Sequence, residues 1–310
     1  MKANKQFTNQ SLAFWAQVRV ISEGAGYTSR KPPEQGSILV PTIEQMKMAM
    51  EKRSLAPTYL VSKKGELTGE GKKLHTYFQY RADVLNNFVR PRLMNADEAK
   101  SKFEILKKKL QPSCPLPINK QKGEKKTEAY LTGIVNMIIE ANIGPSKCDF
   151  DPRQLTVITK NGIPLRTLTR RVDGAFPSTN NPIALWEIKE FYHTTTFGSR
   201  VADSVYETLL DGMELLELRQ SQGIHVLHYL MIDAYETWWI QGRSYLCRII
   251  DALSMGYIDE VLFGYEVIEQ LPKIVQGWVK QKNSNVTPSI ITFPASLQGA
   301  SFRKGISRRK

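Results

Sequence analysis

The sequence predicts an α/β or α+β protein, with a central mixed β-sheet flanked by helices and a mainly helical N-terminal region. Three observations lead to this class. Apolar and polar residues alternate at 184–192, as in a strand, and a nearly continuous apolar run at 224–232 is typical of a strand covered by helices on both faces. Apolar residues at helical spacing fill 127–142 and 199–218. With 310 residues and 41% hydrophobic content, the chain can bury one large core or two modest ones.

The second half of the chain alternates strands with helices. Residues 127–142 form the leading helix, which Gly144-Pro145 ends. Residues 154–160 form a strand, and Asn161-Gly162 is a strong hairpin signal that turns the chain back toward the next strand at 171–176. The remaining elements are a turn at 177–182, a strand at 184–192, a helix at 199–218, a strand at 224–232, a helix at 235–255, a strand at 260–265 and a last helix at 268–279.

The first half is predicted to contain two amphipathic helices, at 43–54 and 70–93. Methionines and aromatic residues at helical spacing are more often core packing than a recognition surface, and both readings stay open for these helices. Pro112 to Pro117 and the lysines that follow interrupt packed elements and mark a boundary. We divide the chain into a helical N-terminal region (1–111), a basic linker rich in proline and lysine (112–126), a core (127–290) and a basic C-terminal tail (291–310).

Two carboxylates and an amine lie where neighbouring strands would present them together. Side chains alternate along a strand, so Glu187 and Lys189 share one face and Trp186 and Ile188 the other. Asp173 lies one hairpin upstream and can meet Glu187. Carboxylate oxygens suit Mg²⁺, and an ammonium balances charge that develops on a phosphate. The pattern therefore indicates Mg²⁺-dependent cleavage of a phosphodiester.

The spacing Glu-x-Lys alone carries no weight, because it occurs four times, at Glu70, Glu98, Glu124 and Glu187. Only the fourth lies in an apolar strand with an aspartate one hairpin upstream. The alternative for this pair is a surface ion pair worth roughly 0 to 1 kcal/mol.

Asp173, thirteen further residues and then Glu187-Ile188-Lys189 resemble the active site of the PD-(D/E)XK nuclease superfamily, and the chain length best fits its type II restriction endonucleases. Val172 stands where the motif's name has proline. The resemblance covers about residues 127–265 and implies a restriction-endonuclease-like core of a helix, three strands, a helix and a further strand. It implies sequence-specific hydrolysis of double-stranded DNA to 5′-phosphate and 3′-hydroxyl ends.

The same resemblance assigns roles to residues. Asp173, Glu187 and Lys189 are the catalytic set; Asp173, Glu187 and the Ile188 carbonyl hold Mg²⁺, and Lys189 positions and activates water. Glu128, from the leading helix, often has a counterpart at the metal site, although the helix dipole alone also favours an acidic residue there. One active site cuts one strand, so a homodimer is expected. The resemblance further implies a cytoplasmic, prokaryotic enzyme of a restriction-modification system.

Charge distribution favours a nucleic-acid partner. The formal net charge is +13; residues 100–126 hold nine lysines and two glutamates, and residues 301–310 hold five basic residues and no acid. Lysines and arginines that neutralise phosphates release counterions and give affinity for DNA. Charge alone leaves RNA open, and such segments can also be simply solvated. The side chains that suit contacts with DNA are Lys47, Lys52, Arg53, Arg81, Arg90, Arg92 and Arg200.

Other chemistries fit less well. His225 and His228 face opposite sides of a strand, so no zinc site is expected, and three cysteines without Cys-x-x-Cys spacing indicate free thiols. Residues 65–73 fail the phosphate-loop pattern because Lys73 stands where Ser or Thr is required, so no nucleotide cofactor is expected. No signal peptide and no membrane span are expected. Two alternatives remain: a structure-specific nuclease of DNA repair or recombination, and a basic DNA-binding protein without catalysis.

Overall fold

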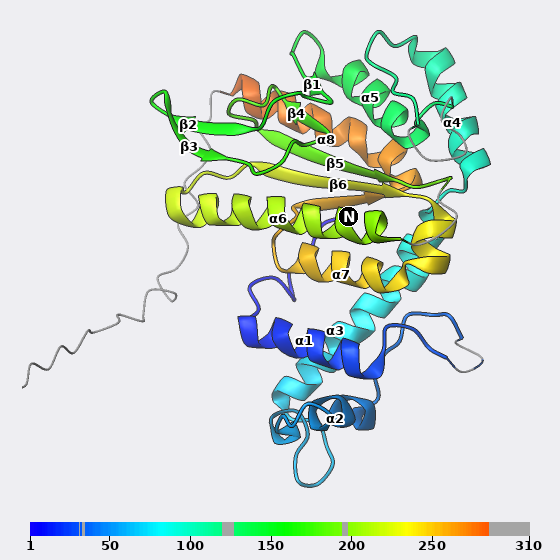
Figure 1. The fold of residues 1–310 in the computed structure, drawn as a ribbon, viewed down its shortest axis with the longest axis vertical. Coiled ribbons are helices and arrows are strands. Elements are labelled where there is room, and N and C mark those ends of the chain that lie inside the picture. Colours follow the sequence, from blue (N-terminus) through cyan, green and yellow to red (C-terminus); the bar gives the residue numbers. More distant parts are fainter. Residues whose placement is uncertain (31, 33–34, 120–126, 194–197, 285–310) are drawn as a thin grey trace, which may run out of the picture.

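A five-stranded mixed sheet forms the centre of the computed structural model, which describes residues 1–30, 32, 35–119, 127–193 and 198–284 (Figure 1). The strand order is β1-β4-β5-β6-β7; β4 is antiparallel to β1 and to β5, whereas β5, β6 and β7 are parallel. The fold is therefore α+β, with the mixed sheet flanked by helices that the sequence predicts. The strands are β1 (Asp149–Phe150), β4 (Gly174–Phe176), β5 (Ala184–Glu190), β6 (Leu227–Asp233) and β7 (Glu260–Phe263).

Helices cover both faces of the sheet (Figure 1). On one face lie α5 (Tyr130–Ile143) and α8 (Tyr265–Asn283), with α4 (Ala96–Leu110) packed against α5. Trp186 of β5 stacks on Trp278 of α8 in this layer, with ring centroids 5.6 Å apart. On the other face lie α6 (Ser199–Gln222), the π-helical turn η4 (Glu236–Gln241) and α7 (Arg243–Ser254). Burial on both faces explains why β6 is apolar along its length.

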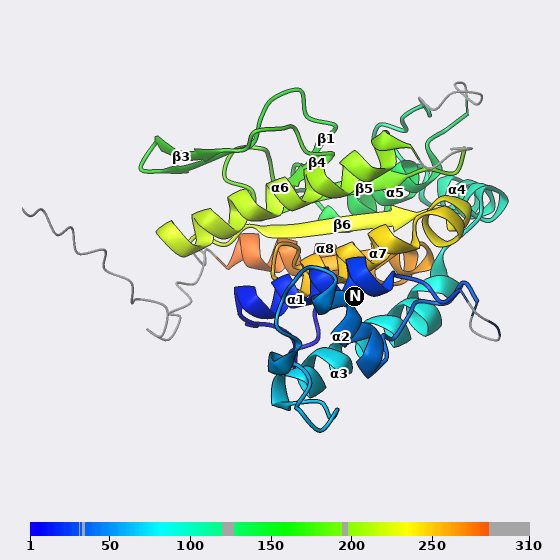
Figure 2. The same cartoon turned by 60° about the horizontal axis from the view of Figure 1, so that its bottom comes forward.

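The N-terminal helices form a smaller core of their own beside α7. They are α1 (Leu12–Ala25), α2 (Ile43–Glu51), the short η1 (Pro57–Tyr59) and α3 (Gly69–Asp83), which continues through the π-helical η2 (Val84–Val89) into η3 (Arg90–Arg92). Figure 2 shows α1, α2 and α3 gathered next to α7, away from β1 and β4. The N-terminal region is thus mainly helical, and it lies on the side of the sheet opposite to α8.

One predicted strand lies elsewhere than expected. The sequence predicts that 154–160 enters the central sheet. Instead β2 (Val157–Lys160) pairs with β3 (Ile163–Thr167) in a separate two-stranded sheet, with Asn161-Gly162 at its turn, and reaches the chain after β4 through an isolated bridge between Val157 and Asn180. The reason is that both edges of β4 are already used, one by β5 and the other by the two residues of β1.

The other predicted elements are found with shifted ends, and two details differ. Gly242 divides the helix expected at 235–255 into η4 and α7. The basic stretch after residue 95 begins as the helix α4, which Asn95 and Glu98 cap reciprocally and which buries Ala99 and Phe103. A capping box of this kind replaces two missing backbone hydrogen bonds at a helix start.

Part of the predicted linker packs against α5: Ser113 donates to Glu140, and the Pro115 carbonyl accepts from Asn136. Residues 120–126 of the linker and the whole tail 291–310 lie outside the described residues. The three cysteines are free thiols, as predicted. In the described part of the chain, no helix has both the length and the apolarity needed to cross a bilayer.

Candidate active site

The hairpin of β4 and β5 places Asp173 opposite Glu187. Gly174 is paired with Trp186, so Asp173, the residue just before β4, lies opposite Glu187 of β5. A Cβ atom on Gly174 would lie 2.1 Å from Cζ2 of Trp186, so this close approach of ring and backbone requires glycine. The Ile188 N–H donates to Asp173 Oδ2 over 2.7 Å. The predicted meeting of the two carboxylates is therefore present.

Glu187 lies at the centre of an ion-pair network. Its side chain is 0% exposed, with Lys189 Nζ 2.7 Å from Oε2 and Arg170 Nη1 3.0 Å from Oε1. Two acids of α6 complete the network: Arg170 reaches Asp211 over 2.6 Å and Glu207 over 3.2 Å, and Lys189 reaches Glu207 over 3.4 Å. We call this set the carboxylate cluster; its members are Arg170, Asp173, Glu187, Lys189, Glu207 and Asp211.

The acids of the cluster differ in their protonation. Burial, and then the charge of Glu187, raise the pKa of Asp173 to about 6 and that of Asp211 to about 7. Burial alone would raise the pKa of Glu187. The charges of Lys189 and Arg170 lower it by more, so the pKa of Glu187 lies below its ordinary value. Burial lowers the pKa of Lys189 less than Glu187 and Asp173 raise it, so this amine stays charged.

The sequence pattern did not single out Arg170, Glu207 and Asp211 as site residues. Glu207 and Asp211 are four residues apart and share one face of α6, which is the face turned to β5. Arg170 carries a weaker signal, since it lies only three residues before Asp173. Helical spacing identifies the face of α6, but only the tertiary packing shows that β5 lies beneath it.

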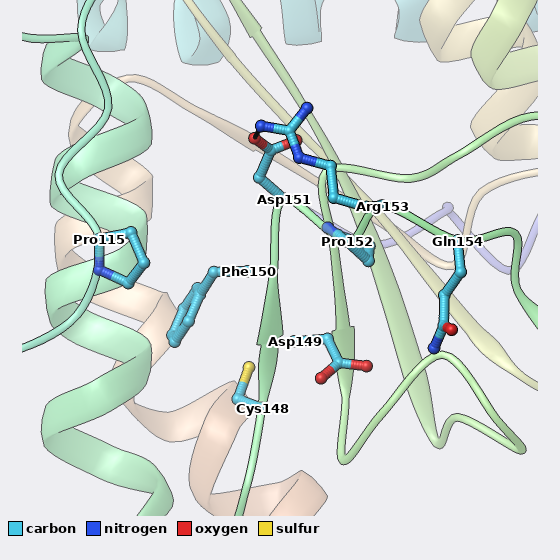
Figure 3. A pocket seen from close by; sticks show the side chains of 8 residues that line it. All are labelled: Pro115, Cys148, Asp149, Phe150, Asp151, Pro152, Arg153 and Gln154. Carbon is cyan, nitrogen blue, oxygen red and sulfur yellow. Dashed lines mark ion pairs between the residues drawn. The ribbon is translucent and has the colours of Figure 1, made fainter.

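A pocket of about 530 Å³ opens beside the carboxylate cluster. Arg153, Arg170 and Arg171 line it together with Asp151 and Asp173. A neighbouring hollow of about 720 Å³ lies over β1 and shares Asp151 and Arg153 with it. Figure 3 shows that these two side chains turn toward each other, and they form an ion pair of 3.1 Å. The half-buried Asp173 thus faces an open surface with three arginines, which suits a polyanion.

The residues fit a divalent cation. Asp173 uses Oδ2 for Ile188 and leaves Oδ1 without a partner among the described residues, and a carboxylate such as that of Glu187 offers about four lone pairs, of which the two cations engage two. N–H and C=O of one strand residue point to the same side, so the Ile188 carbonyl is expected to point to the side of β5 on which Asp173 lies. Within the described ranges no group of three or more His, Cys, Asp or Glu side chains is arranged to hold a metal ion, so this set relies on the carbonyl.

Glu128 does not join the carboxylate cluster in the structure. It precedes α5, and Lys107 of α4 lies 3.4 Å from its carboxylate. The helix α5 packs against the Trp186 face of β5, whereas Glu187 and Lys189 point to the α6 face. The sheet therefore separates Glu128 from the position that the resemblance implied.

Arg81 is a correction to the predicted DNA-binding residues. Its side chain is 1% exposed, and its guanidinium bonds Asp251 of α7 and Ser22 of α1. Burial and the Asp251 charge explain its role: it joins the N-terminal helices to the core and offers no surface to DNA. The sequence indicates only that its side chain is of a type that suits DNA, and the packing of α3 against α7 buries it.

The other candidates are scattered over several elements, and those whose side chains are described are more accessible than Arg81. Lys47 pairs with Glu51, Arg53 pairs with Glu23, and Lys52 is exposed. Arg90 lies over Trp239, and Arg92 lies over Phe88. Arg200 is in the first turn of α6, and its side chain lies outside the described part of the structure. Among the side chains that are described, none of these candidates contacts the carboxylate cluster.

Comparison with known proteins places both halves of the chain in families. The model of a domain of unknown function, DUF7690, matches residues 1–88, which hold α1, α2 and α3. No curated protein and no solved structure matches the chain. The model of a second domain of unknown function, DUF7687, matches residues 94–278, which hold the central sheet and the carboxylate cluster. Since this match spans more than half of the chain, the protein belongs to the DUF7687 family.

Proposed function

We propose that this protein is a Mg²⁺-dependent type II restriction endonuclease that hydrolyses double-stranded DNA at specific sequences. The observation that carries the proposal is the carboxylate cluster itself: Asp173 and Glu187 are cross-strand neighbours, and Lys189 lies on the same face of β5, bonded to Glu187. The three residues identified from the sequence thus share one site beside an arginine-lined pocket.

The chain's own groups have separable roles. Asp173, Glu187 and the Ile188 carbonyl would hold Mg²⁺, which when bound polarises a phosphoryl oxygen and makes water a better nucleophile. Lys189 stays charged, so it orients the attacking water and balances charge on the phosphate rather than accepting a proton. Arg153 and Arg171 neutralise neighbouring phosphates.

The reaction is an in-line displacement at phosphorus. The water oxygen forms a bond to phosphorus while the bond from phosphorus to the 3′-oxygen breaks. The water releases its proton to solvent, and the leaving oxygen takes one up, which gives a 5′-phosphate and a 3′-hydroxyl.

The order of elements supports the proposal. Along the chain, α5, β1, β4, β5, α6 and β6 follow the order of a helix, three strands, a helix and a strand, with the β2–β3 hairpin inserted after β1. An enzyme of this kind works in the prokaryotic cytoplasm beside a modification activity. It acts as a homodimer, because two sites are needed to cut both strands of a palindrome.

A second candidate is DNA binding without catalysis. Two observations favour it: Glu187 is completely buried, and a cation already faces each of its two carboxylate oxygens. Such a network can be purely structural. In that case the arginines of the pocket would bind phosphates, and the carboxylates would only hold α6 on the sheet.

A cleavage assay separates these functions. Long unmethylated duplex DNA is incubated with the protein and Mg²⁺ or chelator, beside the Asp173→Asn variant. The matched control is Asp151→Asn, which changes an exposed carboxyl of the same pocket outside the cluster. Discrete Mg²⁺-dependent bands from the wild type and the control, absent from Asp173→Asn, are the expected result. A smear would indicate a repair-type nuclease, and intact DNA with retained binding would favour the second candidate.

A further inference from the structure

One guanidinium nitrogen bridges two buried carboxylates from different elements. Arg170 Nη1 lies 3.0 Å from Glu187 Oε1 of β5 and 2.6 Å from Asp211 Oδ2 of α6. The side chains of Glu187 and Asp211 are both 0% exposed, whereas Arg170 is 23% exposed and reaches them from the pocket. The cation therefore enters from the substrate side and occupies the gap between the two acids.

One carboxylate oxygen beside this nitrogen is left unsatisfied. Asp211 Oδ1 is buried and has no hydrogen-bond partner, although buried carboxylate oxygens are normally bonded. Glu207, which is half exposed, adds a third carboxylate within 3.2 Å of the guanidinium. Carboxylate oxygens are the ligands that divalent cations prefer, and the free Oδ1 of Asp211 is available beside the two oxygens that face Nη1.

The position of this gap is also informative. Glu187 belongs both to the proposed Mg²⁺ site with Asp173 and to the gap with Asp211. A carboxylate shared between two adjoining cation positions is the arrangement used by hydrolytic sites with two metal ions, where the ions are about 3.5 to 4 Å apart. Here the second position is occupied by a side chain.

We propose that Arg170 is a resident cation that stands in the second of two metal positions, so that this site works with one divalent ion instead of two. The inference rests on the proposed function for the first ion, at Asp173 and Glu187. Arg170 is a positioning residue: it keeps Glu187 and Asp211 together and excludes a second ion. Removing its charge leaves the buried Asp211 without a cation and Glu187 with Lys189 alone, which is costly unless another cation enters.

The test is a count of bound Mn²⁺ by titration calorimetry and by electron paramagnetic resonance of the free ion. The variants are Arg170→Gln, Arg171→Gln as a matched control on the next residue, and Arg170→Gln combined with Asp211→Asn. We expect one ion per chain for the wild type and for Arg171→Gln. Arg170→Gln should bind two ions, and the double variant should return to one.

Equal counts of one ion in the wild type and in Arg170→Gln would overturn the inference, as would two ions in the wild type. A wild type that binds no ion, beside an Arg170→Gln variant that binds one, would support the inference and contradict the metal site of the proposed function. If Arg170→Gln is unfolded without ions, Mn²⁺ should restore its circular dichroism spectrum. A spectrum that Mn²⁺ leaves unchanged would speak against a second ion.

Discussion

At the scale of single residues, the candidate chemistry depends on which side chains share an environment. The same spacing, Glu-x-Lys, gives a solvated pair at Glu70 and Lys72 and a buried, bonded pair at Glu187 and Lys189. The difference lies in the charges around each pair. Only the second has Asp173, Arg170 and the acids of α6 nearby, and there the pKa of Glu187 is lowered and that of Lys189 is raised.

Lys189→Gln should lower the rate of Mg²⁺-dependent cleavage by about 10²- to 10³-fold, because the charge that orients water and balances the phosphate is lost. Lys72→Gln is the matched control, since it changes an exposed lysine of the same spacing and should cleave at the wild-type rate. Single-turnover rates on a plasmid give the comparison. An unchanged rate for Lys189→Gln would remove this lysine from the mechanism.

Arg81→Met should destabilise the protein by about 3 to 5 kcal/mol, because it leaves Asp251 buried without its charged partner. Arg53→Met removes an exposed arginine and should change stability by less than about 0.5 kcal/mol. Unfolding in guanidinium chloride measures both effects. Arg81→Met would contradict the structure if it stayed as stable as the wild type while losing affinity for DNA.

At the scale of elements, the β4–β5 hairpin sets the geometry of the site. Its register puts Asp173 opposite Glu187, and that register depends on the ring of Trp186 lying against the bare Cα of Gly174. The helix α6 then supplies Glu207 and Asp211 from above the same face. Two carboxylates come from adjacent strands and two from one helix, so any shift of the hairpin changes the whole cluster.

Gly174→Ala should destabilise the protein by about 1 to 3 kcal/mol, because the added methyl overlaps the ring of Trp186. The same change should weaken Mn²⁺ binding, because it moves Asp173 away from Glu187. Gly277→Ala, in α8 with open space around its Cα, should instead stabilise by about 0.5 to 1 kcal/mol. Chemical unfolding and calorimetry test the pair; equal stability of the two variants would contradict the packing of Trp186 on β4.

At the scale of the whole molecule, the buried carboxyl of Asp233 joins the sheet to Met94, where the DUF7687 region begins. Asp233, at the end of β6, accepts from the N–H groups of Met94 and Ala234 and from the Tyr192 hydroxyl. Burial raises the pKa of Asp233 to about 8, from an ordinary value of 3.8. Folding therefore takes up a proton between about pH 4 and pH 8.

This proton uptake gives the stability a pH dependence with a definite sign. Below about pH 4 the raised pKa of Asp233 contributes its full stabilisation of the folded state. As the pH rises from about 4 to about 8, the free energy of unfolding loses about 1.4 kcal/mol of this contribution per pH unit. Asp233→Asn should therefore gain stability relative to the wild type as the pH rises from 5 to 8. Asp203→Asn, at an exposed position, is the control. Unfolding curves at four pH values measure the difference; a constant difference would mean that Asp233 does not titrate in this range.

The net charge of +13 also belongs to the whole molecule. A chain ending at residue 290 lacks the five basic residues of 301–310. It should bind DNA less tightly, and its plot of log affinity against log salt should be shallower by up to about 4 to 5, from the counterions no longer released. Fluorescence anisotropy at several salt concentrations with Ca²⁺ gives the slopes. Identical slopes would show that these residues do not contact phosphates.

The sequence by itself predicted most of the elements that surround the candidate site, and its central residues, but not α1, α4 or β1. Strand alternation put Glu187 and Lys189 on one face, the polar turn at 177–182 returned the chain to Asp173, and apolar periodicity placed the helices and strands around them. These are short-range properties, which depend on neighbours along the chain.

The tertiary structure decided everything that depends on distant partners. It put β2 in a separate hairpin because β1 already covered the edge of β4, and it buried Arg81 because α7 covers that face of α3. It also brought Arg170 and Asp211 to Glu187 and kept Glu128 on the other side of the sheet. Period and spacing describe one element at a time, whereas pairing of strand edges and packing of faces depend on which elements compete for the same surface.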